Sequence, residues 1–190
     1  MYTLMTDRMY MTLSNPKLAK EVADFNLRNK EALRDTEPAR PLSYYTVRGC
    51  RDYLREDYKD AKRGSEFRYY LTLKGSKKII GTVCIGSILF GSVKSCTPSY
   101  KMDKDYRKQG LCSEAVEEII HVAFKILQLH RIDAMVMPRN RGSLRIMNKF
   151  GFEKEGLAVR CLEVNQVWED HYRFALINDD ISAKQNYADK

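Results

Sequence analysis

The fold depends most on one stretch, Tyr106-Arg107-Lys108-Gln109-Gly110-Leu111-Cys112-Ser113-Glu114-Ala115, which joins a strand-like run at residues 97–102 to a strongly amphipathic helix. A short glycine-containing loop that opens a helix points several backbone N–H groups in one direction, and the helix dipole adds partial positive charge. Arg107 and Lys108 add side-chain charge to the same loop. The stretch therefore predicts a site for a phosphate-bearing cofactor.

Outward from this loop, hydrophobic runs predict the strands of a sheet. Residues 66–73, 79–90 and 95–102 are rich in β-branched and aromatic side chains, with a turn at residues 74–77. Met9, Met11 and Leu13 alternate with polar residues, as in a half-buried first strand. Beyond the loop the sequence predicts a short buried strand and then a hairpin that turns at Asn165-Gln166, over residues 132–137, 159–164 and 168–177.

Helices are predicted between these strands, over residues 15–29, 47–62, 111–127 and 144–150. Asn15-Pro16 marks the first start, Glu37-Pro38-Ala39-Arg40-Pro41 breaks that helix, and Gly64 closes the second. The resulting order, β-α-α-β-β-β-α-β-α-β-β, predicts a mixed α/β fold with a central sheet covered by helices. We expect a single domain at residues 1–178 and a polar C-terminal tail at residues 179–190.

Composition narrows the class of protein. Lys and Arg exceed Asp and Glu by 33 − 25 = 8, which favours anionic partners such as phosphates, CoA-type cofactors or RNA, although a solvated basic surface explains the excess equally well. No apolar run approaches the roughly 18 residues of a membrane span, and the first residues lack the apolar centre of a signal peptide. The five cysteines form no C-x-x-C pair and the three histidines have no zinc spacing, so we expect a cytoplasmic protein without a metal.

Three motifs together carry a family resemblance. Residues 107–112 resemble the acetyl-CoA pyrophosphate loop of the GNAT N-acetyltransferase superfamily, whose pattern is Arg/Gln-x-x-Gly-x-Gly/Ala. Residues 140–143 and 149–156 resemble the N-x-x-S and K-x-G-F-x-x-E-G signatures of one branch, the bacterial ribosomal-protein-alanine N-acetyltransferases. Residues 168–171 and the dipeptide at residues 37–38 extend the likeness from about Thr6 to Asn178.

The resemblance implies a GNAT fold: a twisted, mostly antiparallel sheet with helices on both faces, whose fourth and fifth strands, here residues 95–102 and 132–137, splay apart. The pantetheine arm of acetyl-CoA would lie in that gap, and a nearby backbone N–H would polarise the thioester carbonyl. Asn140 would bind the cofactor arm, and Ser143 would protonate the departing thiolate. The other cofactor-binding residues would be Lys101 and Met102, through their backbone, and Arg107, Lys108, Gln109, Gly110, Leu111, Cys112 and Ser113 of the loop.

The chain departs from the family pattern at three positions. Cys112 stands at the last Gly/Ala position, where the helix N-terminus favours a lowered thiol pKa; we expect a packing role rather than a covalent acyl-cysteine. Met135 and Met147 stand where some relatives carry a glutamate base and a tyrosine acid, and we interpret both as core residues.

The missing base bears on the acceptor. A lysine amine, with a pKa of about 10.4, is almost wholly protonated at neutral pH, whereas an α-amine near 7.7–8.0 is roughly a tenth neutral. A site without a strong base therefore suits a protein N-terminus better than a lysine. Glu37, in the loop where the family binds substrate, is the candidate to hold the amine, although a solvated loop carboxylate is an equal alternative. Tyr44 and Tyr45 either line a substrate cleft or serve packing.

These observations lead to a ranked set of functions. The first is direct transfer of acetyl from acetyl-CoA, in a ternary complex, to the N-terminal α-amine of a protein, with a ribosomal protein as first guess. The second keeps the chemistry and changes the acceptor to a polyamine, an aminoglycoside or an amino acid. The third is a non-catalytic ribosome- or RNA-binding protein, which basic charge alone supports. Membrane association and direct nucleic-acid binding are not expected, and monomer and homodimer both stay open.

Overall fold

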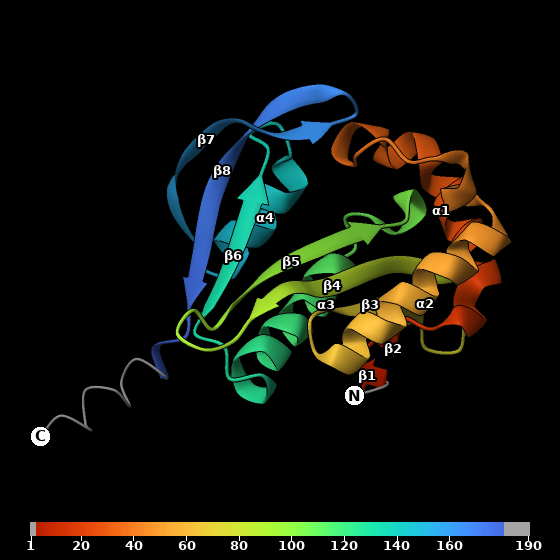
Figure 1. The fold of residues 1–190 in the computed structure, drawn as a ribbon, viewed down its shortest axis with the longest axis horizontal. Helices are drawn as coiled ribbons and strands as arrows, with labels where there is room; N and C mark the ends of the chain where they lie inside the picture. Colours follow the sequence, from red (N-terminus) through yellow and green to blue (C-terminus); the bar gives the residue numbers. More distant parts are fainter. Residues whose placement is uncertain (1–2, 181–190) are drawn as a thin grey trace, which may run out of the picture.

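The computed structural model describes residues 3–180, which form one mixed sheet covered by helices (Figure 1). The sheet has eight strands in the order β1-β2-β3-β4-β5-β6-β8-β7. Every neighbouring pair is antiparallel except β5 and β6, which are parallel. The strands are β1 (Thr3–Met5), β2 (Met9–Leu13), β3 (Phe67–Leu73), β4 (Ile79–Leu89), β5 (Ser95–Met102), β6 (Arg131–Val136), β7 (Glu153–Val164) and β8 (Val167–Ile177).

The parallel pair opens into the expected gap. β5 and β6 are paired only at Ser95 with Arg131 and at Cys96 with Ile132, near the start of each strand. Beyond these two positions the strands diverge, as Figure 1 shows. The predicted splaying of the strands at residues 95–102 and 132–137 is therefore confirmed, and it leaves the second half of β5 paired with β4 but without a strand partner on its β6 side.

Helices cover both faces of the sheet, as predicted. α1 (Ala19–Leu33) and α2 (Val47–Arg63) pack together with Tyr70 and Ile79, whereas α3 (Leu111–His121) and α4 (Arg141–Lys149) pack with Tyr69 and Ile80. Neighbouring residues of one strand thus enter opposite cores, because side chains alternate across a sheet. Figure 1 shows α1 and α2 side by side over the β2–β4 part of the sheet.

The helix starts and ends follow local sequence signals. Asn15 caps a 3-10 turn, η1 (Pro16–Leu18), that leads into α1, and α1 continues to Leu33, beyond the predicted end near residue 29. Thr46 caps α2 by accepting a hydrogen bond from the N–H of Gly49. α3 continues as a π-helical turn, η5 (Val122–Ile126), so the predicted helix at residues 111–127 has two parts.

Two sequence predictions need correction and one extends past the described chain. β1 was not predicted, and β7 begins at Glu153 rather than at residue 159. The tail predicted at residues 179–190 lies outside the described residues except for residues 179 and 180, so the domain boundary stays a prediction. Within residues 3–180, no helix is both long and apolar enough to cross a membrane.

Candidate active site

The loop before α3 has the backbone geometry of an anion-binding site. Gly110 stands at the N-cap of α3 with φ 80°, a left-handed conformation that favours glycine, and no side chain caps the helix. The first N–H groups of the helix are therefore left for an external acceptor. Two neighbours fix the loop: the Gln109 side chain donates to the Asp105 carbonyl at 3.0 Å, and Arg107 donates to the carbonyls of Met102 and Ala32 at 3.3 and 3.0 Å.

Ion pairs anchor both ends of this loop. At its start, Asp103 is 1% exposed and accepts from Arg28 Nη2 and Nε at 2.7 and 3.2 Å. At its end, Glu114 accepts from the Arg8 Nε and backbone N–H at 2.6 and 2.9 Å, while Arg8 Nη1 donates to the Gln109 carbonyl. Burial raises the pKa of each carboxyl, but hydrogen bonds, from Arg28 to Asp103 and from Thr6 and Arg8 to Glu114, hold both below their ordinary values.

The loop borders a cavity of about 560 Å³, which we call the cofactor cavity. Its charged lining is mostly basic, and Glu37 is the one acidic side chain among the described residues that line it. Leu111 is the predicted site residue that does not line it, because its side chain is buried in the core. The predicted residues that do are Glu37, Lys101, Met102, Arg107, Lys108, Gln109, Gly110, Cys112, Ser113, Asn140 and Ser143.

Sequence reasoning missed several residues of this cavity. Arg145 and Lys149 line it from α4, and their spacing of four residues on one helix was a signal that they share a face. Tyr100 also lines it, and a side-chain hydrogen bond links it to Ser143. Burial raises the pKa of Tyr100 to about 12, although this bond opposes the rise, so the hydroxyl keeps its proton at neutral pH.

Asn140 has a structural contact at the start of α4. Its Oδ1 accepts from the Ser143 N–H at 3.1 Å and so caps the helix. The cap fixes Ser143 in the first turn of α4, on the border of the cofactor cavity. Asn140 and Ser143 thus both border the cofactor cavity. Cofactor binding by Asn140 and protonation of the thiolate by Ser143 stay predictions.

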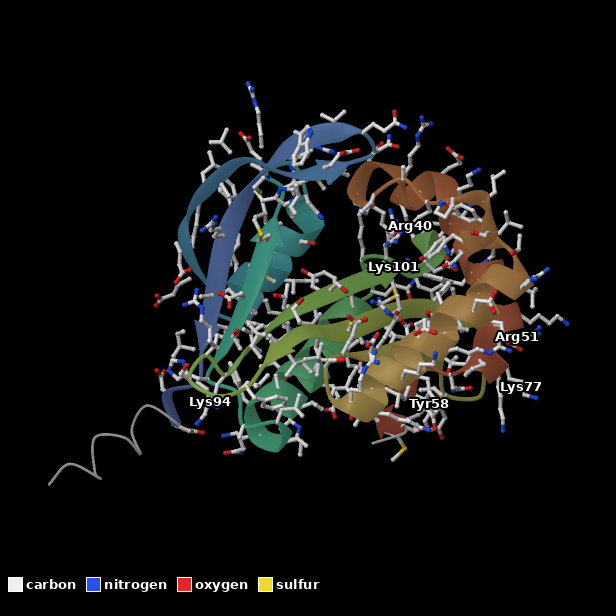
Figure 2. All side chains as sticks on the ribbon, viewed as in Figure 1. Arg40, Arg51, Tyr58, Lys77, Lys94 and Lys101 are labelled. Atoms are coloured by element: carbon white, nitrogen blue, oxygen red, sulfur yellow. The ribbon has the colours of Figure 1, made fainter. Side chains whose placement is uncertain are left out.

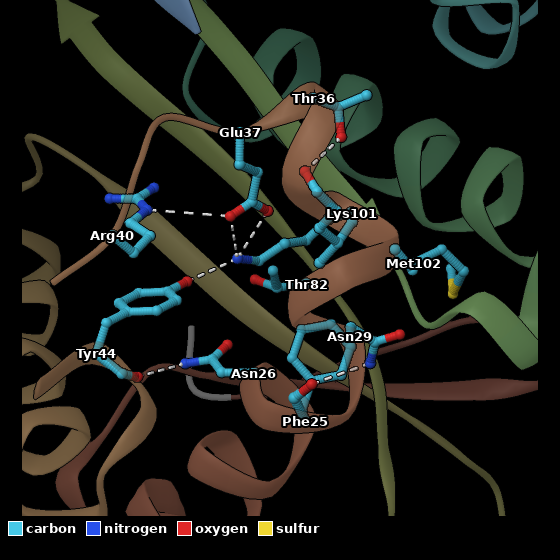
Figure 3. Close-up of polar contacts among 12 residues, drawn as sticks. Phe25, Asn26, Asn29, Thr36, Glu37, Arg40, Tyr44, Thr82, Lys101 and Met102 are labelled. Atoms are coloured by element: carbon cyan, nitrogen blue, oxygen red, sulfur yellow. Dashed lines mark hydrogen bonds and ion pairs between the residues drawn. The ribbon is translucent and has the colours of Figure 1, made fainter. Parts of the chain in front are cut away.

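On the opposite side of β5, the Lys101 side chain reaches Glu37 (Figure 3). Its Nζ lies 3.0 Å from Glu37 Oε1, 3.3 Å from Oε2 and 2.7 Å from the Tyr44 hydroxyl. Arg40 Nε lies 4.0 Å from Glu37 Oε2, and its guanidinium stacks 4.9 Å from the Tyr44 ring centre. We call Glu37, Lys101 and Tyr44 the ammonium–carboxylate cluster.

A second cavity of about 270 Å³, which we call the acceptor cavity, lies next to the cofactor cavity and shares Leu33 with it as well as two members of this cluster. Glu37 and Lys101 line both. Figure 2 shows Arg40 and Lys101 near one another beside β5, whereas Arg51, Lys77 and Lys94 lie at the periphery. The acceptor cavity is lined by Asn26, Lys30, Glu31, Leu33, Arg34, Glu37, Pro38, Ala39, Arg40, Tyr44, Tyr45, Lys101 and Asn165.

The two tyrosines left open by the sequence border this cavity. Tyr44 and Tyr45 both line it, and Tyr44 also stacks on Tyr53 with ring centres 5.4 Å apart, so packing and cavity lining coincide. A third cavity of about 500 Å³ adjoins them and shares Arg40, Tyr44 and Lys101 with the acceptor cavity. Asn165 reaches the acceptor cavity from the β7–β8 turn, a contact between distant segments that no local pattern signals.

Two expectations for individual side chains were wrong. The Cys112 thiol does not have a lowered pKa, because burial raises it to about 12, which outweighs the expected effect of the helix N-terminus. Met147 is buried in the core as expected, but Met135 is 39% exposed and is not a core residue.

All five cysteines are free thiols. Among residues 3–180, no group of three or more His, Cys, Asp or Glu side chains gathers as metal ligands would.

The family follows from comparison with known proteins. Residues 11–153 match the family model described as an acetyltransferase (GNAT) domain. The chain belongs to the GNAT acetyltransferases. The predicted family and fold are thereby confirmed, and so is the predicted enzyme class, an acetyl-CoA-dependent acetyltransferase.

Three similar proteins show how far the likeness extends. A protein named "Probable N-acetyltransferase YjcK" from Bacillus subtilis (strain 168) is 35% identical over 162 residues, 85% of this chain and 90% of the relative. The [Ribosomal protein uS5]-alanine N-acetyltransferase of Escherichia coli (strain K12) is 32% identical over 177 residues, 93% of this chain and 91% of the relative. The crystal structure of ribosomal-protein-S5-alanine acetyltransferase from Vibrio fischeri has a TM-score of 0.89 at 31% identity, covering 94% of this chain and 97% of that one.

Proposed function

We propose that this GNAT enzyme transfers the acetyl group of acetyl-CoA to the N-terminal α-amine of a protein, with a ribosomal protein as the first candidate. The observation that carries the proposal is that the cofactor and acceptor cavities meet at Glu37 and Lys101. A thioester in one cavity and an amine in the other would thus come together across a single layer of side chains. This arrangement supports direct transfer in a ternary complex.

The cofactor cavity fits acetyl-CoA in charge and in backbone geometry. Its pyrophosphate would accept hydrogen bonds from the uncapped start of α3, next to Gly110, and the basic lining would offset its charge. Arg107, Lys108, Gln109, Cys112 and Ser113 contribute to this part of the cavity. The edge of β5 that faces β6, which has no strand partner at Lys101 and Met102, would bind the pantetheine arm, and Asn140 would contact it from the start of α4.

The chemistry is a nucleophilic substitution at the thioester carbonyl. The acceptor nitrogen forms the new C–N bond, the C–S bond breaks, and the leaving thiolate takes a proton while the nitrogen loses one. Ser143 would supply the proton to the thiolate, and the Tyr100 hydroxyl, which is hydrogen-bonded to Ser143 and stays protonated at neutral pH, would support that transfer. Glu37 would accept a hydrogen bond from the amine.

Charge in the acceptor cavity favours a protein N-terminus over a small polycation. Basic side chains outnumber acidic ones along its wall: Lys30, Arg34, Arg40 and Lys101 against Glu31 and Glu37. A polyamine or an aminoglycoside carries several positive charges and would be repelled there. The two relatives named for ribosomal-protein alanine acetylation make a ribosomal protein beginning with Ala or Ser the first acceptor to test.

The test is release of CoA thiol from acetyl-CoA in the presence of short peptides that begin with Ala or Ser. Each peptide is paired with the same sequence blocked by an Nα-acetyl group, which removes the nucleophile and leaves everything else. Turnover with the free peptide and none with the blocked one is expected. If no free peptide from a panel of ribosomal N-termini supports thiol release, while spermidine does, the acceptor class is wrong.

A further inference from the structure

The carboxylate proposed to hold the acceptor amine already holds an ammonium group of the protein itself. Lys101 Nζ contacts both oxygens of Glu37, and the two side chains are only 14% and 18% exposed. The Tyr44 hydroxyl accepts a further hydrogen bond from the same Nζ (Figure 3). Since both cavities border this pair, an amine that reaches the cofactor cavity from the acceptor side meets it first.

We propose that Lys101 is a specificity-determining residue: its ammonium neutralises Glu37, so the acceptor must bind as a neutral amine, and protein N-termini are selected over lysine side chains and polyamines. This inference rests on the proposed function, because it concerns the acceptor of the same reaction. Lys101 acts here through charge and position, and it forms no bond to the acetyl group.

The charges around the pair support this role. Glu37 and Lys101 cancel, and Arg40, 4.0 Å from Glu37, leaves the immediate surroundings net positive. Other charged or titratable groups also line the two cavities on this side. They are Lys30 and Glu31 of α1, Arg34 directly after it, Tyr45 beside Tyr44, Asp52, Tyr53 and Asp57 of α2, and Arg68 and Tyr70 of β3. Among the acids, Glu31 pairs with Arg34, Asp52 with Arg55 and Asp57 with Arg68.

A neutral amine still finds a partner at this site. A carboxylate has two oxygens with about four acceptor positions, so Glu37 can accept from Lys101 and from an incoming N–H together. An incoming ammonium group is not stabilised in the same way, because it would have to compete with the Lys101 ammonium for the single negative charge of Glu37. At pH 7 about a tenth of an α-amine is neutral against about 1 in 2,500 of a lysine side chain, so a neutral-only site favours the N-terminus by a few hundred-fold.

Removing the charge of Lys101 tests this directly. Lys101→Met leaves Glu37 with only the more distant Arg40, 4.0 Å away, as a cationic partner, and so opens the carboxylate to an incoming ammonium. The ratio of kcat/KM for an Ala-starting peptide to that for an Nα-acetylated lysine peptide should therefore fall at least ~10-fold, because the Coulomb energy between two unit charges at this distance near a protein surface exceeds the energy of a tenfold change. The change should lie mostly in a lower KM for the lysine peptide. Lys101→Arg keeps the cation and should keep the wild-type ratio.

A double variant provides the matched control. Glu37→Gln with Lys101→Met removes both charges, so the attraction for an ammonium disappears and the ratio should return toward the wild-type value. If Lys101 only supports packing, Lys101→Met lowers activity on both peptides equally and the ratio stays constant, which overturns the proposal. Lys101→Gln, which keeps a polar end at this position, serves the same purpose if the methionine variant has an altered melting curve.

A binding measurement separates this inference from the proposed function. Calorimetric titration of the CoA-loaded enzyme with the Nα-acetylated lysine peptide needs no turnover, and Lys101→Met should bind it at least ~10-fold more tightly than wild type. If wild type acetylates no N-terminus but the variant gains this affinity, the proposed function fails and the charge exclusion stands. If wild type acetylates N-termini and neither ratio nor affinity changes, only the role of Lys101 is wrong.

Discussion

The ion pair between Arg28 and Asp103 should hold the start of the cofactor loop to α1, and Arg28→Met tests it. Asp103 is 1% exposed, accepts two hydrogen bonds from Arg28, and accepts another from the Asp105 N–H that starts the loop turn. Arg28 also donates to the Ile79 carbonyl at 2.9 Å and pairs with the exposed Asp24. Removing one partner of a buried pair leaves an uncompensated charge, which costs about 3–5 kcal/mol when both are fully buried.

Because the Arg28 side chain is 24% exposed, we take the lower limit. The free energy of unfolding should then fall by about 3 kcal/mol, which lowers Tm by roughly 6–12 °C in a chain of this size. The KM for acetyl-CoA should rise as well, since the loop loses its anchor. Arg55→Met is the matched control, because the pair that Arg55 forms with Asp52 is more than half exposed on both sides and should contribute at most about 1 kcal/mol.

The pH dependence gives a second check on the same pair. The folded pKa of Asp103 is lowered, so its contribution to stability is complete above the unfolded value of about 3.9 and is lost as pH falls through the lower folded value. In Arg28→Met that contribution is missing at neutral pH. Chemical denaturation should therefore show a difference between wild type and variant that is constant from pH 8 to pH 5 and shrinks below pH 4. Equal losses of stability in Arg28→Met and Arg55→Met at pH 7 would refute the reasoning.

Three further predictions concern the cofactor cavity. Ser143→Ala should lower kcat by about 10-fold to 10³-fold in thiol-release assays, as expected for loss of a general acid, and an unchanged kcat would mean that water protonates the thiolate. Gly110→Ala should raise the KM for acetyl-CoA, because residue 110 has φ 80° and an added Cβ would lie 3.3 Å from Arg8 Nη2. Gly91→Ala is the control: residue 91 has φ 75° but open space around it, so this variant should leave that KM unchanged at a similar cost in Tm. Cys112, whose thiol pKa burial raises to about 12, should react slowly with iodoacetamide at pH 7.5 and carry no acetyl label by mass spectrometry; rapid alkylation would contradict the raised thiol pKa.

Much of the sheet could be predicted because its strands carry strong hydrophobic patterns. β5 has the predicted bounds, and β4 differs at its last residue; β4 is a central strand whose side chains are nearly all buried. β1 was missed because it has three residues at the sheet edge, none of them buried. β7 starts earlier than predicted because Glu153, Lys154 and Glu155 are charged and exposed, and an edge strand with one open face needs no apolar pattern there.

The parts of the site that could be predicted from the sequence are those formed by residues close together in the chain. Gly110 and the loop around it, and the Asn140–Ser143 turn, each place their groups through backbone geometry within a few residues, so their sequence is informative. The partner of Glu37 was not predictable, because the contact with Lys101 depends on how the loop after α1 packs across β5. The link between Tyr100 and Ser143 was missed for the same reason, since it joins β5 to α4 across the cofactor cavity.

Alternation along β5 explains how one short strand borders both the cofactor cavity and the ammonium–carboxylate cluster. Tyr100 and Met102 pack toward the α3 and α4 side, while the Lys101 side chain projects to the α1 side, where it lies 6.0 Å from the Phe25 ring centre. Gly81, opposite the end of β5, lets β4 approach closely, because a Cβ there would lie 2.8 Å from the Lys101 carbonyl oxygen. A shift of one residue in this register would exchange the two faces, moving the cation into the cofactor side and an aromatic ring against Glu37. The close pairing at Gly81 therefore fixes which side chain of β5 faces Glu37, and the charge on that side chain is what the Lys101 variants change.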